Sequence, residues 1–414
     1  MTSVFNIIFY ILVFLSLYVQ VFLFITFLED RKKILVRKGS INLKEYPAVT
    51  VIVPCWNEEK TIYKTVNSIL HLNYPQDKVR IFLVDDGSTD GTFSVMKKFE
   101  NYKNVKIFQK ENGGKYTALN LGLSYADTPF VGCLDADSAA DPEALVRIMS
   151  YFEKDPTVMA VAPSIIVQKS ENIIQSAQEV EYHMSIFIKK MLGLLGAIHV
   201  TPGPLSMFRK KVFDDLGVYR HAHNTEDMEM AFRMQKNHYK IEHCNDAYIY
   251  TNTPRTIPKL FRQRLRWIYG FINNTIDYKS LLFKKKYGNF SLFTIPAALV
   301  SILSVGYLFG KVIYNVGHFI YSKVLEFQAV GFTTKIPLNK FDLFFINTHS
   351  PIFIILVVYI LVVASIVLGQ NMVKGKWRIS LDVISFFIIF GLVGPLWLLK
   401  AVYHTLVSRM PSWR

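Results

Sequence analysis

The sequence predicts an α/β domain with a mostly parallel sheet, accompanied by transmembrane and interfacial helices. Short β-branched runs alternate with helical patterns through the middle of the chain, which is typical of parallel sheets. Four long apolar segments lie outside that region, at about residues 4–28, 292–314, 351–368 and 381–401. Each is long enough to cross a bilayer core about 30 Å thick. A hydrophobic fraction of 51% over 414 residues agrees with a membrane protein that also has a sizeable soluble domain.

The expected strands and helices follow one another along residues 47–254. Strands are expected at residues 49–53, 80–84, 105–108 and 129–134, each a short apolar run. Helices are expected from about Asn57, over 115–125, from Asp141-Pro142-Glu143 onward, and over 226–237. In the third of these, aspartate is a good cap and proline suits the first helical turn. Glycine patterns of dinucleotide-binding folds and of phosphate-binding loops do not occur, which excludes those classes.

Charge sets the expected orientation in the membrane. Five basic residues follow the first apolar run and none precedes it; they are Arg31, Lys32, Lys33, Arg37 and Lys38. The positive-inside rule then places the amino terminus outside and the central domain in the cytoplasm. The first run is expected to be an anchor, because it lacks a basic leader and a small-residue cleavage site. The net charge of +15 does not indicate nucleic-acid binding, since the basic residues cluster beside apolar segments, where anionic headgroups attract them.

Carboxylates follow two of the expected strands. Asp85-Asp86-Gly87-Ser88 follows the second strand and Asp135-Ala136-Asp137 follows the fourth. In open α/β sheets, ligands bind at the carboxyl ends of the strands. The pair Asp135 and Asp137 is suited to a hard divalent cation whose other ligands are substrate phosphates, and the competing interpretation is a solvated turn. For Asp85 and Asp86 the competing interpretation is ordinary turn chemistry after a strand.

Further candidates lie in polar segments between the strands. Asp227 begins an expected helix, where it is either a general base or a carboxylate that favours the helix dipole. Glu226 and Glu229 beside it are expected to be solvated or capping groups. Lys115 follows two glycines and either approaches a phosphate or simply begins the next helix. The two histidines of segment 221–223 have no evident partner, so a flexible loop is expected there.

The segment Gln263-Arg264-Leu265-Arg266-Trp267 combines an amide, two guanidiniums and an indole in little more than one helical turn. Such groups can hold a diphosphate and stack on a sugar ring. At 3.6 residues per turn, one helix face carries Gln263, Arg266, Trp267 and Gly270, and another carries Phe261, Leu265, Ile268 and Ile272. We expect the polar face to meet the central domain and the apolar face to meet the bilayer. The competing interpretation is a basic amphipathic helix lying in the headgroup layer.

Together these motifs resemble the processive branch of the family 2 glycosyltransferases, which includes cellulose, chitin, hyaluronan and poly-N-acetylglucosamine synthases. The resemblance extends from Val49 to Gly270 and implies a GT-A-type fold. The matching motifs are Val53 to Glu58 (first strand), Asp85-Asp86-Gly87-Ser88 (nucleotide), Gly114-Lys115 (diphosphate), Asp135-Ala136-Asp137 (metal), Gly203-Pro204 (acceptor), Thr225-Glu226-Asp227 (catalytic base) and Gln263 to Trp267 (processive members).

The resemblance implies a role for each matching residue. Asp227 would be the catalytic base, and Asp135 and Asp137 would hold Mg²⁺ or Mn²⁺. The residues implied in binding a UDP-sugar donor are Pro54, Asn57, Glu58, Asp85, Asp86, Lys115, Asp135, Gln263 and Arg266. The residues implied in binding the acceptor are Gly203, Pro204, Glu226 and Trp267.

The implied activity is inverting transfer of a sugar, with N-acetylglucosamine the nearest case, to a growing β-linked polysaccharide at the cell membrane. Export through about four spans would need dimerisation or a small membrane partner. Two alternatives stay open: transfer of a single sugar to a lipid-linked acceptor, and a membrane channel or scaffold with an inactive transferase domain. The expected division is an N-terminal transmembrane helix (1–30), a basic linker (31–46), the GT-A domain (47–254), interfacial helices (255–287) and about three membrane helices (288–414).

Overall fold

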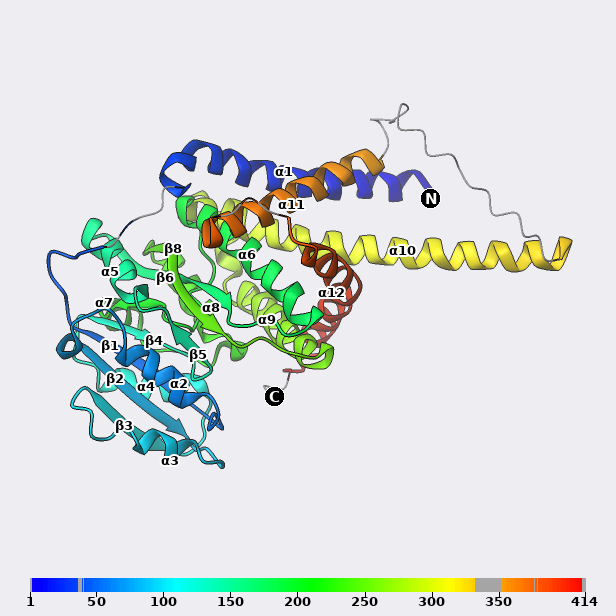
Figure 1. Cartoon of the computed structure of the whole chain (residues 1–414). Helices are drawn as coiled ribbons and strands as arrows, with labels where there is room; N and C mark the ends of the chain where they lie inside the picture. The colour runs from blue at the N-terminus through cyan, green and yellow to red at the C-terminus, as the bar shows by residue number, and fades with distance from the viewer. Residues whose placement is uncertain are drawn as a thin grey trace. The chain divides into compact units, whose positions relative to one another are not determined.

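The computed structural model describes residues 2–35, 39, 41–331, 351–375, 377 and 379–411 (Figure 1). Its contacts divide the chain into two compact units. One unit consists of Met1–Phe24 with Pro296–Ala364, and the other of Ile25–Ile295 with Ser365–Arg414. The second unit holds the sheet and every candidate site residue. The domain boundaries expected from the sequence remain a prediction, and Arg37 and Lys38 of the expected basic linker lie outside the described residues.

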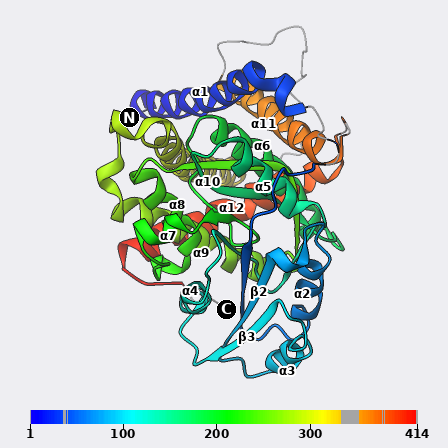
Figure 2. The same cartoon turned by 90° about the vertical axis from the view of Figure 1, so that its left-hand side faces the viewer.

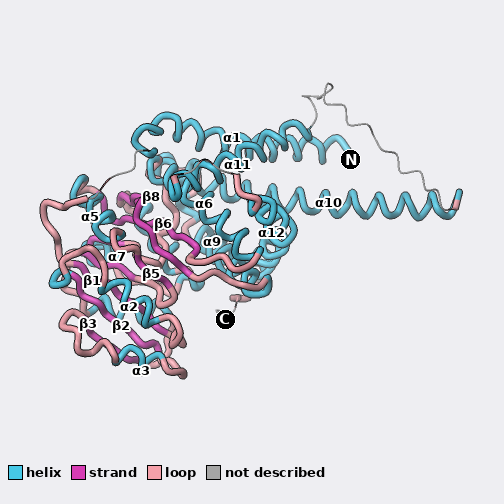
Figure 3. Tube along the Cα trace, viewed as in Figure 1, coloured by secondary structure: helices cyan, strands magenta, loops and turns pink. Residues whose placement is uncertain are grey.

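An eight-stranded mixed sheet forms the centre of the second unit (Figure 3). The strands are β1 (Val49–Cys55), β2 (Val79–Asp86), β3 (Val105–Lys110), β4 (Phe130–Cys133), β5 (Ser138–Ala140), β6 (Val158–Val167), β7 (Met207–Arg209) and β8 (Lys240–Thr251). Their spatial order is β3–β2–β1–β4–β7–β6–β8–β5. Strands β1 to β4 are parallel, as are β6 and β8, whereas β7 is antiparallel to both neighbours and β5 to β8. The predicted α/β domain with a mostly parallel sheet is therefore confirmed.

Helices lie before, between and after the strands. They are α1 (Thr2–Leu35), α2 (Ile62–Leu70), α3 (Thr92–Lys97), α4 (Lys115–Ser124), α5 (Ala144–Lys154), α6 (Ile173–Leu194), α7 (Lys211–Leu216), α8 (Glu226–Lys236), α9 (Ile257–Asp277), α10 (Ile295–Val330), α11 (Pro351–Lys374) and α12 (Asp382–Leu406). Short 3₁₀ turns occur at Gln76–Lys78, Ala222–Asn224, Lys279–Leu281 and Lys285–Tyr287, and a π turn at Phe290–Thr294 precedes α10.

The parallel half of the sheet is covered on both faces. Strands β1 and β2 are buried at every position except Pro54 and Arg80, so they are continuous apolar runs and do not alternate. Helix α4 packs on these two strands (Figure 2). Gly122 permits this close approach, because an added Cβ would lie 2.6 Å from a methyl carbon of Ile52. The carboxyl ends of β1, β2 and β4 are thereby held at one edge of the sheet.

Two predicted helix starts differ from the structure. Helix α2 begins at Ile62 and not near Asn57, because Asn57 has a left-handed backbone (φ 56°) and residues 58–61 form a hydrogen-bonded turn. Helix α5 begins at Ala144. Asp141 still orders the preceding turn, since its carboxylate accepts a hydrogen bond from the Glu143 backbone N–H at 3.0 Å. The helices predicted at residues 115–125 and 226–237 are confirmed as α4 and α8.

Four helices in the described part of the chain are long and apolar enough to cross a membrane, judged by length and composition. These segments are Ile7–Lys32, Phe290–Ala329, Phe353–Lys374 and Asp382–Leu406. They coincide with the four apolar segments predicted from the sequence. Within the first unit, α1 and α10 are in contact: the Lys311 ammonium lies 4.1 Å from the ring centroid of Phe9, and the hydroxyls of Ser16 and Ser304 are 3.4 Å apart.

Helix α12 belongs to the second unit, where it packs against α6 and α9. Its Trp397 contacts Phe261 of α9 edge to face, with ring centroids 6.2 Å apart. The expectation that Phe261 and Leu265 face the bilayer is therefore wrong, because Phe261 packs on α12 and Leu265 is buried. The opposite side of α12 exposes Ile384 and Leu392, so this helix is apolar on both its packed and its open side.

Candidate active site

Asp135 and Asp137 lie directly after β4, at the sheet edge where the sequence predicted them. The Lys115 ammonium, at the start of α4, is 2.6 Å from Asp135 Oδ1 and 3.3 Å from Glu226 Oε1 of α8. Burial, followed by the charges of Asp135 and Glu58, raises the pKa of Asp137 to about 7. Burial acts to lower the pKa of Lys115, but Asp135 and Glu226 hold it well above its usual value. One lysine thus offsets a cluster of buried carboxylates.

Two glycines bring backbone close to this cluster. Gly114 caps α4 with φ 91°, a conformation that favours glycine, and so places Lys115 in the first helical turn. Gly203 lies against the ion pair, since an added Cβ would be 2.7 Å from Lys115 Nζ and 2.8 Å from Asp135 Oδ1. The turn formed by Gly203 and the half-buried Pro204 therefore borders the carboxylates.

Asp85 and Asn57 organise the ends of β2 and β1. The buried Asp85 carboxylate accepts hydrogen bonds from the Ser88 N–H at 3.1 Å and from Gln109 Nε2 at 3.2 Å. The Asn57 N–H donates to Ser88 Oγ at 3.0 Å, and Asn57 Oδ1 accepts from the Thr89 N–H at 2.8 Å. Asp85 thus forms the turn hydrogen bonds of the competing interpretation. Its contact with a nucleotide, which the resemblance implies, remains a prediction.

Asp86 orders the loop that leads to Lys115. Its carboxylate accepts hydrogen bonds from Lys110 Nζ at 2.7 Å and from the backbone N–H groups of Gly113 and Gly114 at 3.1 and 2.9 Å. Because the side chain is 3% exposed, these bonds form away from water and stay strong. Asp86 therefore sets the start of α4 and, with it, the position of Lys115.

Pro54 and Glu58 lie on either side of the β1 terminus. Pro54 is the half-buried position of β1, and the Glu58 carboxylate accepts a hydrogen bond from the Thr61 hydroxyl at 2.8 Å. The charge of Glu58 contributes to the raised pKa of Asp137, so this carboxylate lies on the same side of the sheet edge.

Asp227 is in the first turn of α8, close to the Lys115 ion pairs. Burial first, and the charge of Glu226 second, raise its pKa to about 6 against the opposing effect of Lys115 and Arg266. The Thr201 hydroxyl donates to the Asp227 carbonyl at 2.9 Å and fixes the backbone there. The expectation that Glu226 is solvated is wrong, because it is 4% exposed and paired with Lys115.

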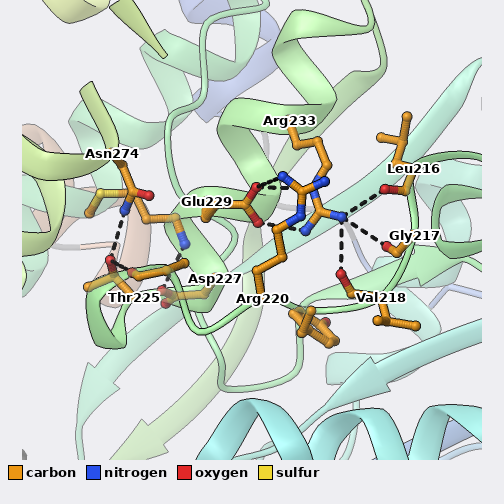
Figure 4. Close-up of polar contacts among 12 residues, drawn as sticks. Leu216, Gly217, Val218, Arg220, Thr225, Asp227, Glu229, Arg233 and Asn274 are labelled. Carbon is orange, nitrogen blue, oxygen red and sulfur yellow. Dashed lines mark hydrogen bonds and ion pairs between the residues drawn. The ribbon is translucent and has the colours of Figure 1, made fainter. Parts of the chain in front are cut away.

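Helix α9 packs directly on the segment that leads into Asp227 (Figure 4). Asn274 Nδ2 donates to the Thr225 hydroxyl oxygen at 2.9 Å, and this hydroxyl donates to the Ala222 carbonyl at 2.9 Å. Gly270 faces the same threonine so closely that an added Cβ would lie 2.9 Å from Thr225 Cβ. Thr225 is therefore held against one face of α9, by a hydrogen bond from Asn274 and by close backbone contact at Gly270.

Glu229 and Arg233 form a buried ion pair one turn further along α8 (Figure 4). Arg233 Nη2 is 2.6 Å from Glu229 Oε2, and Arg233 Nη1 donates to the carbonyls of residues 216–218 at 2.8, 3.1 and 3.0 Å. The Tyr278 hydroxyl donates to Glu229, and Arg220 Nη1 lies 3.6 Å from it. Of the two expected roles for Glu229, solvated or capping, the first is excluded, because Glu229 is buried and pairs with Arg233, which anchors the loop that precedes residues 222–227.

Residues 222–224 have an uncommon backbone. Ala222, His223 and Asn224 have φ values of 44°, 56° and 60°, and each non-glycine residue in the left-handed region costs about 1 kcal/mol. Arg266 Nη1 donates to the Asn224 carbonyl at 2.8 Å, and His223 Nε2 is 2.8 Å from Asp277 Oδ2. The His223 side chain thus has a carboxylate partner that the sequence did not reveal. Contacts from α9 hold this strained segment in place.

The predicted polar face of α9 reaches the catalytic segment through Arg266 and Gly270. Gln263 and Trp267 are half-buried on the same helix, and Gln263 Oε1 is a buried oxygen without a hydrogen-bond partner among the described residues. The Arg264 guanidinium carbon lies 4.2 Å from the Trp267 ring centroid. One face of the indole is therefore covered by an arginine.

The carboxylates after β4 fit a divalent cation that substrate phosphates would help to bind. Within the described residues, no group of three or more His, Cys, Asp or Glu side chains is arranged to hold a metal alone. Burial is the main cause that raises the pKa of Asp137, and the nearby charge of Asp135 adds to it, as expected for carboxylates that share a hard cation. Asp135 Oδ1 has an ion pair but no hydrogen bond in the described part of the chain, so an acceptor position stays open.

Sequence reasoning missed several residues that shape the site. Asn274, Arg233, Arg264 and Glu181 hold residues 222–227, the loop before them or the Trp267 ring, and of these only Arg264 belongs to a motif, in which it was given no role. The helical spacing indicated part of this arrangement. Arg264 precedes Trp267 by three residues, and Asn274 follows Arg266 by eight. Pairing of α6 with α9 through Glu181 had no local signal.

The sheet order, with acidic side chains at the end of β2 and just after β4, is that of a GT-A glycosyltransferase fold. Residues 50–217 match the family model of Glycosyl transferase family 2. The chain is 31% identical over 269 residues to a poly-beta-1,6-N-acetyl-D-glucosamine synthase of Staphylococcus aureus (strain COL), covering 64% of this chain and 65% of the relative. It is 30% identical over 273 residues to the enzyme of that name from Staphylococcus epidermidis, with the same coverage.

The alignment spans less than two thirds of the relatives' length, 65% in each case. Among solved structures, a mannosyltransferase from Pyrobaculum calidifontis in complex with GDP-Man and Mn²⁺ superposes with a TM-score of 0.59. The match covers 96% of this chain and 99% of the mannosyltransferase at 18% sequence identity. At that identity the likeness establishes the fold.

Proposed function

We propose that this protein is a membrane-bound inverting hexosyltransferase that moves a sugar from a UDP-sugar donor to a growing β-linked polysaccharide. The observation that carries the proposal is one largely half-buried cluster in which Lys115 pairs with Asp135 and the buried Glu226, close to Asp137 and Asp227. Such a cluster combines cation ligands, a counter-charge for a leaving diphosphate and a candidate base. The similarity to the staphylococcal synthases favours N-acetylglucosamine as the transferred sugar.

The donor would bind at the carboxyl edge of β1, β2 and β4. Its uridine would lie against Asn57, Asp85 and Asp86, with Pro54, Glu58 and Gln263 bordering the donor. Lys115, Arg266 and the first N–H groups of α4 would offset the charge that develops on the diphosphate. Mg²⁺ or Mn²⁺ held by Asp135 and Asp137 would stabilise the same leaving group when bound.

Asp227 would accept the proton of the acceptor hydroxyl. With a pKa of about 6 it is mostly ionised at neutral pH, yet more basic than a solvated aspartate. The hydroxyl oxygen then attacks the anomeric carbon from the side opposite the diphosphate, which inverts that carbon and gives a β linkage. Glu226 and the Gly203-Pro204 turn would border the acceptor, and Trp267 would stack on one of its sugar rings.

We further propose that the site faces the cytoplasm of a multi-pass cell-membrane protein whose amino terminus is outside. The basic residues that follow the first apolar helix support this orientation. The partners would be the donor, a polysaccharide or lipid-linked acceptor and the bilayer, with no nucleic acid. A second copy of the chain or a small membrane protein would complete an export path.

Purified protein incubated with single UDP-sugars and Mg²⁺ or Mn²⁺ tests the proposal, with products identified by mass analysis. A ladder of β-linked products from UDP-N-acetylglucosamine is expected, and its loss in Asp227→Asn is the control. A single addition to a lipid would favour the lipid-acceptor transferase. No transfer from any donor by a folded protein would leave a channel or scaffold and overturn the proposal.

A further inference from the structure

Arg264 lies inside the Gln263 to Trp267 segment, but none of the roles above uses it. Its side chain is nearly fully buried, at 3% exposure. Arg264 Nη2 is 2.5 Å from Glu181 Oε2 of α6, and its guanidinium carbon is 4.2 Å from the Trp267 ring centroid. One arginine therefore connects α6, α9 and the aromatic ring.

The nitrogen atoms of Arg264 are poorly satisfied, in contrast to those of Arg233. In Arg233, Nε and Nη2 bond to Glu229 and Nη1 donates to three backbone carbonyls (Figure 4). In Arg264, Nε and Nη1 are buried without a hydrogen-bond partner in the part of the chain that the structure describes. The two buried arginines thus differ in their contacts: Arg233 anchors a loop through its hydrogen bonds, whereas Arg264 forms fewer hydrogen bonds.

This ion pair, in which Arg264 is buried and the Glu181 side chain is 24% exposed, adds little to folding. The free-energy cost of removing two charges from water is about as large as the free energy of their attraction, unless the remaining N–H groups are hydrogen-bonded. Burial raises the pKa of Glu181 even though Arg264 acts to lower it, so desolvation outweighs the attraction for this carboxylate. Departures from good packing chemistry concentrate at functional sites, and this one touches Trp267.

The ion pair also lies beside the catalytic cluster. Burial raises the pKa of Tyr182, next to Glu181 on α6, to about 12; the charge of Arg264 and a hydrogen bond with its side chain oppose this shift, and the charge of Asp137 adds to it. Lys189, two turns further along α6, is influenced by the charge of Asp227. The face of α6 that carries Glu181 is therefore directed toward the groups that would perform the transfer.

We propose that Arg264 is a positioning residue for the acceptor: held by Glu181, its planar guanidinium fixes the plane of the Trp267 ring, whose opposite face then stacks on a pyranose sugar of the acceptor. A guanidinium over an indole is favourable and directional, because both groups are flat. The inference rests on the proposed function only in taking Trp267 as an acceptor-binding residue.

The double variant Glu181→Met with Arg264→Met tests this role, since it removes the pair without leaving a lone buried charge. The acceptor KM should rise about tenfold, the scale of a lost aromatic contact. The donor KM, kcat and the slow hydrolysis of the donor by water should stay as in the wild type, and the unfolding temperature should be equal or higher. Arg264→Lys keeps the ion pair but not the flat stack, so it should keep the unfolding temperature and show most of the KM increase.

Arg233→Met supplies the reference for a structural role, because it leaves Glu229 buried and unpaired. It should lower the unfolding temperature and the yield of active protein without a selective change in acceptor KM. If the double Met variant behaves in that way, or if its acceptor KM is unchanged, Arg264 does not position the acceptor.

If the wild type transfers no sugar, the proposed function has failed. The inference is then tested separately, by titrating the protein with oligosaccharides and following its tryptophan fluorescence. Weaker binding by the double variant supports the inference, and equal binding overturns it.

Discussion

A single methyl group at Gly270 should disturb the catalytic segment. In the structure the α9 backbone at Gly270 packs on Thr225, two residues before Asp227. A Cβ added there would lie 2.9 Å from Thr225 Cβ and closer still to its Oγ1 and Cγ2. Thr225 would have to move by about 1 Å, since ordinary carbon contacts begin near 3.5 Å. Gly270→Ala therefore changes the position of the catalytic segment without removing any of its functional groups.

This displacement has consequences for both stability and rate. Overpacking of this kind costs about 1–3 kcal/mol, and loss of the Asn274–Thr225 hydrogen bond adds about 1 kcal/mol. A shift of about 1 Å in the segment that holds the base lowers turnover about 100-fold. We expect Gly270→Ala to show both effects, with a donor KM close to that of the wild type.

Gly391→Ala is the matched control, because Gly391 is also a helical glycine of the second unit and an added Cβ there meets nothing within 4 Å. It should keep the full rate and gain up to about 1 kcal/mol from the better helix propensity of alanine. The assay is release of UDP in the presence of acceptor, together with thermal unfolding in detergent. A Gly270→Ala protein with wild-type kcat would refute the reasoning that α9 positions Asp227 through Thr225.

Three further predictions follow from the described contacts and charges. Asp227→Asn removes the base while keeping its shape, so transfer should fall by ~10²–10⁴-fold while calorimetry shows unchanged donor binding; a fall within tenfold would exclude Asp227 as the base. Transfer should decline as the pH falls through about 6, where Asp227 becomes protonated. Mn²⁺ should raise the unfolding temperature less below pH 7, where Asp137 takes up a proton. A transfer rate or an Mn²⁺ effect that does not depend on pH would contradict the corresponding prediction. Ala222→Gly should raise the free energy of unfolding by about 1 kcal/mol, because glycine adopts the left-handed backbone freely; an unchanged unfolding temperature would mean that the segment is not strained.

The parallel half of the sheet could be predicted because its strands can be recognised from short runs of consecutive residues. Strands β1, β2 and β4 are apolar runs that are almost entirely buried, and the carboxylates at the end of β2 and just after β4 mark the edge where ligands bind. Strands β5 and β7 are only three residues long, which is too short for any period to appear. Their antiparallel pairing is decided by contacts between segments far apart in the sequence.

The candidate site was predictable where a motif is local, and not where two helices meet. Asp135, Asp137, Lys115 and Asp227 come together as the strand-end argument and the resemblance expected. Glu229 was expected to be solvated, because a buried ion pair and an exposed helical carboxylate look alike in a polar sequence. The contacts of α9 with residues 222–225 depend on how that helix is packed, which no short motif encodes.

The place of α12 in the second unit has a practical consequence for the design of shorter versions of this protein. The chain leaves that unit after Ile295 and re-enters it at Ser365, so the fold is closed by residues far beyond the last strand. A soluble fragment cut before α10 would retain the site residues but would bare the sides of α6 and α9 that α12 covers. The minimal working fragment is therefore discontinuous, and a workable truncation would join Ile295 to the segment beginning at Ser365.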